Sequence, residues 1–136
     1  MAQHRVRSSS QFRIATSAAR AVAQTYTFPT AGGSQGFAPP KGINAVRVYI
    51  EITAVTSTPS TTFAIQAYDK LNAQWHDLIV SSAQAAIGRL YLEVGPDCAA
   101  VANQSAGKYI GGKIRVRATH ANTNSMTYNI VGEWTS

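Results

Sequence analysis

Residues 45–56 alternate apolar and polar side chains almost without a break. The apolar members Val46, Val48, Ile50, Ile52 and Ala54 fall on one phase, and Arg47, Tyr49, Glu51 and Thr53 fall on the other. Successive side chains of a β-strand point to opposite faces of its sheet, so a period of two indicates a strand with one buried face and one exposed face. This stretch therefore predicts a half-buried strand.

The same alternation returns along the chain between turn-forming residues. Further strands are expected at residues 21–28, 62–69, 89–94 and 113–120, in a return strand from Trp75, and in a last strand with Met126, Tyr128, Ile130 and Trp134 in its inner row. The return strand leaves its inward face open, because Trp75 and Ile79 share one side while Leu78 and Val80 share the other. Apolar residues at helical spacing are confined to a short turn at residues 84–87. About seven or eight short strands without a helix predict an all-β chain, a single antiparallel β-sandwich or jelly roll.

The size of the chain suits a single domain. It has 136 residues, of which 45% are apolar, enough for a core of its own. The single cysteine, Cys98, cannot form an internal disulfide, and no Cys/His spacing is typical of a structural zinc site. Apolar runs are far shorter than the about 20 residues that cross a bilayer, so we expect neither a membrane span nor a secretory signal.

Charge is distributed unevenly. Six of the twelve lysines and arginines, and none of the six acids, precede Glu51, so the whole net charge of +6 lies in the first fifty residues. Residues 1–19 are polar, Ser-rich and Arg-rich, and predict an extended basic arm that orders on docking, followed by the sandwich domain at residues 20–136. Such an arm suits nucleic acid, an anionic membrane or an acidic protein surface.

Three sets of residues are candidate contacts with a partner. The arm supplies Arg5, Arg7, Phe12, Arg13 and Arg20. A long irregular loop at residues 30–42, rich in glycine and proline, supplies Phe37, Pro39, Pro40 and Lys41. The strand at residues 113–120 supplies an outward stripe of Lys113, Arg115 and Arg117. For this stripe, a solvated face paired with Glu51, Glu93 or Glu133 on neighbouring strands is the more common explanation.

Side chains suited to catalysis are few. His76 and Asp77 are sequence neighbours, so in a strand they point to opposite faces. His120 lies on an inner phase, where a hydrogen-bonded imidazole is more common than a ligand, and Cys98 has no neighbouring base and is interpreted as a small filler. The sequence therefore predicts no enzyme, no metal and no cofactor. Trp75, at the end of a hairpin, leaves open a sugar-binding surface.

Three segments together resemble a pattern found in small structural proteins of tailed bacteriophage virions. They are FAIQAYDKLNAQW at residues 63–75, RLYLEVGP at residues 89–96 and KIRVRATHANTNSMTYNIVGEW at residues 113–134, about half of the chain. Within that group, the size, the β fold and the basic arm are most similar to those of capsid cement, or decoration, proteins.

The resemblance implies a jelly-roll-like domain on the outer surface of an icosahedral capsid. There it would bridge copies of the major capsid protein and resist internal DNA pressure, in a virion assembled in the host cytoplasm. The implied partner is the major capsid protein. Pairing of edge strands would join two copies of the chain into a homodimer, and we expect no membrane and no direct contact to nucleic acid. The alternatives are a jelly-roll coat, tail or neck protein whose basic arm binds nucleic acid, and a carbohydrate-binding adhesion module.

Overall fold

The computed structural model describes residues 11–20, 25–28, 39–40, 42–108, 110 and 113–135. These residues form nine strands and no helix, which confirms the predicted all-β class. The strands are β1 (Gln11–Arg20), β2 (Thr25–Phe28), β3 (Ala45–Val55), β4 (Thr61–Asp69), β5 (Gln74–Val80), β6 (Gly88–Val94), β7 (Ser105–Ala106), β8 (Ile114–His120) and β9 (Met126–Thr135). The part of the chain seen here has no helix that would span a membrane.

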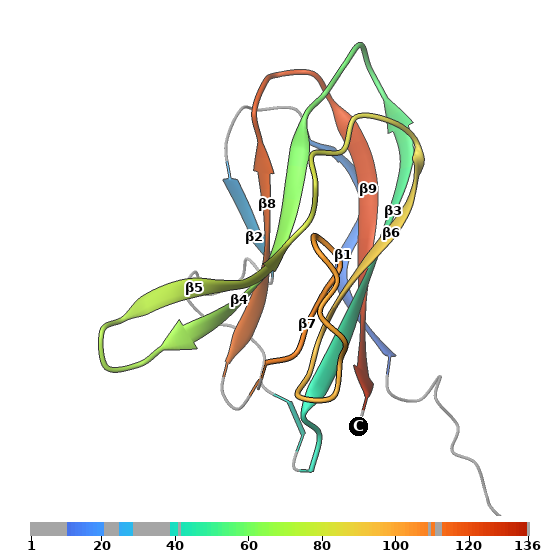
Figure 1. Cartoon of the computed structure of the whole chain (residues 1–136). Coiled ribbons are helices and arrows are strands. Elements are labelled where there is room, and N and C mark those ends of the chain that lie inside the picture. Colours follow the sequence, from blue (N-terminus) through green and yellow to red (C-terminus); the bar gives the residue numbers. More distant parts are fainter. Residues whose placement is uncertain are drawn as a thin grey trace, which may run out of the picture.

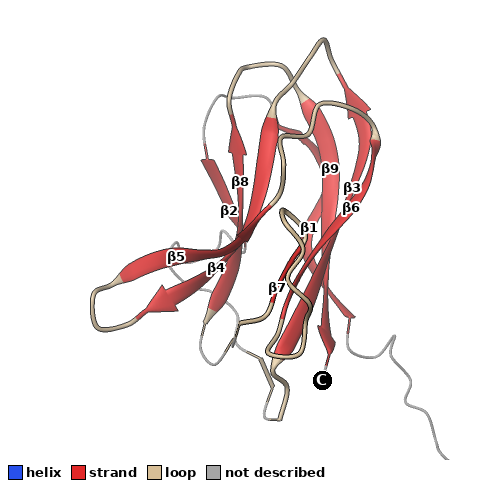
Figure 2. Ribbon diagram, in the orientation of Figure 1, coloured by secondary structure: helices blue, strands red, loops and turns tan. Residues whose placement is uncertain are grey.

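Two sheets pack face to face (Figure 1). Sheet A has the order β1-β9-β3-β6-β7, and sheet B has the order β2-β8-β4-β5. Every pairing is antiparallel except that of β6 with β7, which is parallel. Figure 2 shows the two layers of strands, with the β4–β5 hairpin extending beyond the side of the sandwich. The predicted antiparallel β-sandwich is confirmed, and the finer assignment to a jelly roll stays a prediction.

The core lies between the sheets and is built from alternate positions of the central strands. Its fully buried members include Val46, Val48, Ile50 and Ile52 of β3, Phe63 and Ile65 of β4, Ile114 and Val116 of β8, and Met126, Tyr128 and Ile130 of β9. These positions confirm the predicted phases. Ala54 is the exception, because a register shift between Ile52 and Ala54 ends the alternation and leaves Ala54 exposed.

A bulge explains why the inward face of β5 was ambiguous. Ile79 lies opposite the buried Ile65, whereas Asp77 lies opposite Gln66, so one extra residue, Leu78, is inserted in β5 between the two pairs. An extra residue reverses the phase of a strand. Leu78 and Ile79 therefore both pack against the core, while the segment of β5 before them follows the opposite alternation.

Strand β1 corrects the prediction of an arm over residues 1–19. Residues 11–20 pair antiparallel with β9 as the edge strand of sheet A. Phe12 and Ile14, two residues apart, pack against the core, and the Phe12 ring stacks on Trp134 with 4.9 Å between ring centroids. The prediction was wrong for residues 11–19. It rested on their basic and polar composition, which hides the short apolar alternation of Phe12 and Ile14. Residues 1–10, with Arg5 and Arg7, lie outside the described residues.

Gly132 of β9 has no side chain, and the ring of Phe12 occupies the space that a side chain would take. A Cβ atom added at Gly132 would overlap that ring, so Gly132→Ala has to displace Phe12. We expect this substitution to lower the free energy of unfolding by about 1–3 kcal/mol, the usual effect of overpacking, in urea denaturation. In a Phe12→Ala background the overlap is gone, and the effect should fall below about 1 kcal/mol. Equal effects in the two backgrounds would contradict the contact.

Candidate functional site

The basic stripe of β8 lies on the outer face of sheet B. Arg115 and Arg117 alternate with the buried residues Ile114, Val116 and Ala118. Lys113, just before the strand, is exposed, and its carbonyl accepts a hydrogen bond from the backbone N–H of Tyr68 at 3.0 Å. The predicted outward direction of the stripe is therefore confirmed for the two arginines.

Arg115 is held in place by two neighbours. Its Nε donates to Oε1 of Gln66 at 2.8 Å, and its guanidinium carbon lies 4.3 Å from the centroid of the Trp75 ring. Gln66 is itself buried and donates its amide to Oδ1 of Asp77 at 2.8 Å. The terminal nitrogens Nη1 and Nη2 of Arg115 have no hydrogen-bond partner among residues 11–20, 25–28, 39–40, 42–108, 110 and 113–135. The guanidinium group of Arg115 is thus held in a fixed position, with its two terminal nitrogens available to a partner. We call these two nitrogens the fork of Arg115.

Arg117 makes an ion pair within the same sheet. Its Nη2 lies 3.3 Å from Oδ2 of Asp77, and both side chains are partly exposed, so the pair contributes under about 1 kcal/mol. The prediction that the stripe pairs with Glu51, Glu93 or Glu133 was wrong. Those carboxylates lie on sheet A, whereas the strands beside β8 are β2 and β4. Burial, and then the charge of Arg117, lower the pKa of Arg115, as expected for a cation without a carboxylate of its own.

Two aromatic rings complete this surface. Tyr68 and Trp75 face each other across the β4–β5 pair, with ring centroids 4.9 Å apart. We use the name sheet-B face for the group Gln66, Tyr68, Trp75, Asp77, Arg115 and Arg117. Arg115 covers one face of the Trp75 indole, so that face is closed to a sugar or a base.

The outer face of sheet A carries a second ordered network. Arg47 pairs with Glu93, with Nη2 3.0 Å from Oε2, and its Nη1 donates to the Tyr49 hydroxyl at 3.3 Å. Tyr49 in turn donates to Oε1 of Glu133 at 2.8 Å. The bond to Tyr49 raises the pKa of Arg47 most, and the pairing with Glu93 adds to it, against the opposite effect of burial. These groups join β9, β3 and β6 across the face.

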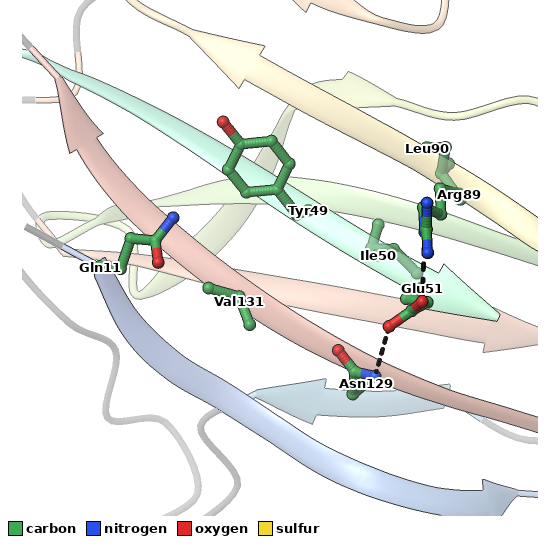
Figure 3. Close-up of a pocket in the computed structure, with 8 residues that line it drawn as sticks. All are labelled: Gln11, Tyr49, Ile50, Glu51, Arg89, Leu90, Asn129 and Val131. Atoms are coloured by element: carbon green, nitrogen blue, oxygen red, sulfur yellow. Dashed lines mark hydrogen bonds and ion pairs between the residues drawn. The ribbon is translucent and has the colours of Figure 1, made fainter. Parts of the chain in front are cut away.

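A shallow hollow of about 340 Å³ lies beside this network (Figure 3). Its lining residues are Gln11, Tyr49, Ile50, Glu51, Arg89, Leu90, Asn129 and Val131. The Glu51 carboxylate accepts hydrogen bonds from Asn129 at 3.4 Å and from Nε of Arg89 at 3.2 Å, and these two bonds, in that order, lower its pKa. The sequence did not predict this hollow. Its lining residues come from four strands, and no local sequence pattern shows the order of those strands in the sheet.

Two of the predicted arm residues act within the described fold. Arg20 donates to the carbonyls of Thr16, Ala18 and Tyr128 at 3.0–3.2 Å, and its guanidinium carbon lies 4.6 Å from the centroid of the Tyr128 ring. These contacts lie where β1 shifts register between Ala15 and Ala18, so Arg20 stabilises the irregular part of the β1–β9 pair. Phe12 packs against the core, as described above.

The other predicted contacts are only partly described. Arg13 is exposed on β1, opposite Val131 of β9. Pro39 is half-buried and Pro40 is exposed, and the Pro40 carbonyl accepts a hydrogen bond from the backbone of Ile43 at 3.0 Å. Phe37 and Lys41 lie outside the described residues. Among the described residues, Arg115 and Arg117 of the β8 stripe lie together in one ordered surface.

His120 is buried, as the sequence predicted, and hydrogen-bonded on both ring nitrogens. Nε2 lies 2.9 Å from the Tyr128 hydroxyl, and Nδ1 lies 3.4 Å from Oγ1 of Thr61. Burial, and then the charge of Arg20, lower the pKa of His120 below its usual 6.5. Burial also raises the pKa of Tyr128. The imidazole therefore belongs to the core.

The buried imidazole makes stability depend on pH. Because the folded-state pKa of His120 lies below 6.5, the unfolded chain binds this proton more tightly. The stability that depends on the neutral ring is complete above about pH 7 and is lost as the pH falls from 6.5 through the lower folded-state pKa. Urea midpoints of the wild type should fall over this range, and those of His120→Gln, which does not titrate, should fall less. Parallel pH profiles would contradict this role.

Residues suited to nucleophilic or metal chemistry lie apart. Asp77 bonds to Gln66 and Arg117, whereas His76 lies 3.5 Å from Asp69, so the two neighbours have separate partners. Cys98 is half-buried, and burial raises the pKa of its thiol. Within the described ranges, no three His, Cys, Asp or Glu side chains lie close enough to hold a metal ion. Comparison with models of known protein families and with curated proteins gave no match.

Proposed function

We propose that the protein is a non-enzymatic virion structural protein that binds the outside of an icosahedral phage capsid and bridges neighbouring major capsid protein subunits. One observation carries the proposal: the two opposite outer faces of the sandwich both hold ordered side-chain networks. Bridging two subunits requires two separate surfaces on one body. The sheet-B face and the Arg47–Tyr49–Glu93–Glu133 network of sheet A supply two such surfaces.

The mechanism is binding by side chains that are already in position. Arg115 bonds to Gln66 of β4, and Arg47 bonds to Glu93 of β6 and to Tyr49 of its own strand. Little side-chain freedom is therefore lost when a partner docks. A capsid presents the same contact many times, and modest interfaces therefore suffice when each copy ties two subunits together. The resemblance of about half of the sequence to virion proteins supports the same reading.

One observation favours a second candidate, a carbohydrate-binding module. The hollow on sheet A combines the ring of Tyr49 with the carboxylate of Glu51 and the amide of Asn129, groups that stack on sugars and bind their hydroxyls. A glycan array separates the two functions. Binding to the array that is lost in Tyr49→Ala, without binding to capsids, would favour the carbohydrate-binding module.

Capsids that lack the protein provide the direct test. Purified protein is mixed with such capsids and sedimented, and the bound amount is measured against the free concentration. We expect saturation at a fixed ratio of protein to capsid subunits, and a higher temperature of DNA release from the saturated particles. Absence of the protein from the pellet, or an unchanged release temperature at saturation, would contradict the proposal.

A further inference from the structure

The β4–β5 hairpin extends beyond the rest of the sandwich (Figure 1). Its tip is a turn at residues 70–73, and Leu71 in this turn is 96% exposed. Ile87, the next most exposed large apolar side chain in the described part of the chain, is 64% exposed. A single exposed leucine is ordinary on a protein surface, so its meaning depends on how the tip is held and what lies beside it.

Asp69 fixes the conformation of the tip. Its Oδ1 accepts hydrogen bonds from the backbone N–H groups of Leu71 at 3.1 Å and Asn72 at 3.3 Å, and its Oδ2 accepts one from the Asn72 amide at 2.7 Å. These bonds, with those to Asn72 first, lower the pKa of Asp69. A turn ordered in this way presents Leu71 in a set position, and a set position lowers the entropy lost on binding.

The fork of Arg115 lies at the base of the same hairpin. Only the Asp69–Gln74 pair separates the tip from the Tyr68–Trp75 pair on which Arg115 rests. With Nε bonded to Gln66, the two terminal nitrogens of Arg115 have the parallel N–H geometry that binds a carboxylate through two hydrogen bonds. An apolar side chain at the tip of the hairpin is thus combined with a cationic side chain over its Tyr68–Trp75 pair.

We infer that this hairpin enters a recess on a partner protein, where Leu71 fills an apolar socket and Arg115 binds a carboxylate on the rim. The inference rests on the proposed function, in which the partner is the major capsid protein. A protein fits better than a nucleic acid for two reasons. A phosphate backbone offers no apolar pocket for the Leu71 side chain. Arg115 also covers one face of the Trp75 ring, so a base cannot stack there.

Two variants and two matched controls test the inference in the capsid sedimentation assay. Leu71→Ser changes the tip of the hairpin, and Arg115→Lys changes the arginine beside it. The controls are Ile87→Ser, which changes another exposed apolar residue, and Lys108→Arg, which changes an exposed lysine that bonds to the carbonyl of Leu78. We expect about tenfold weaker binding for Leu71→Ser, about fivefold weaker binding for Arg115→Lys, and less than about twofold change for the controls.

Wild-type affinity in both hairpin variants would overturn the inference while leaving the proposed function intact. Absence of wild-type binding would instead overturn the proposed function. The unfolding midpoint in urea is measured for each variant, so that a loss of binding is accepted only from a folded protein.

A titration without capsids tests the carboxylate receptor separately. Hexaglutamate peptide is added to isotopically labelled protein, and the Nε–H signal of Arg115 and the indole N–H signal of Trp75 are followed by NMR. Both signals should shift with peptide in the wild type and in Lys108→Arg. In Arg115→Lys, which lacks the Nε–H group, the Trp75 signal should shift much less. A Trp75 shift in Arg115→Lys equal to that of the wild type, or tighter binding of oligothymidylate at the two wild-type signals, would overturn the inference.

Discussion

Deleting residues 1–20 should lower the free energy of unfolding by about 4 kcal/mol or more relative to deleting residues 1–10. The second deletion removes Arg5 and Arg7, and the first also removes β1. With β1 the core loses Phe12 and Ile14, and burying side chains of this size contributes about 1.5–3 kcal/mol each. The backbone of β9 that pairs with β1 also becomes an unprotected sheet edge, so the shorter chain should aggregate more readily.

Urea denaturation followed by tryptophan fluorescence measures this difference, because Trp134 stacks on Phe12. Coincident unfolding curves for the two deletions would show that residues 11–20 contribute nothing to the fold. Residues 1–19 would then have to be described as an arm that is separate from the sandwich. The comparison of the two deletions isolates β1 from the residues before it.

Phe63→Ala should destabilise the sandwich by about 3–5 kcal/mol. The ring is fully buried between the sheets and meets Tyr128 edge-on, with 5.0 Å between ring centroids, so its removal leaves a cavity at the centre of the core. Urea denaturation gives the value directly. Leu71→Ala, a truncation of an exposed side chain, is the control and should change stability by less than about 0.5 kcal/mol. A cost of less than about 1.5 kcal/mol for Phe63→Ala would contradict this packing.

The predicted strands correspond to β2, β3, β4, β5, β6, β8 and β9 of the described residues. Their buried faces follow the sequence best where the alternation of period two is long. In β3, β8 and β9 that period fixes which side chains face the core, whatever strands lie beside them, and the buried rows follow the sequence. Edge strand β1 was missed for the converse reason. Much of β1 is exposed, so its composition is that of a surface segment, and its pairing with β9 spans more than a hundred residues of sequence.

The candidate site was predictable only in part. The period of two placed Arg115 and Arg117 outside, but their partners depend on the order of strands in space. Sheet order places β4 beside β8 and β5 beyond β4. This order gives Arg117 the carboxylate of Asp77 and places Arg115 over Trp75. The bulge at Leu78 adds to this, because it turns Asp77 and Trp75 toward the outer face. Neither the order nor the bulge has a local sequence signal.

A reconstruction of capsids saturated with the protein by electron cryomicroscopy tests the central proposal most directly. The proposal predicts density for the sandwich on the outer surface of the shell, in contact with two neighbouring subunits. The separate inference on the β4–β5 hairpin predicts that its tip lies in a recess of one of them. Density that touches a single subunit, or a shell whose outer surface is bare at a saturating concentration of protein, would contradict a bridging role.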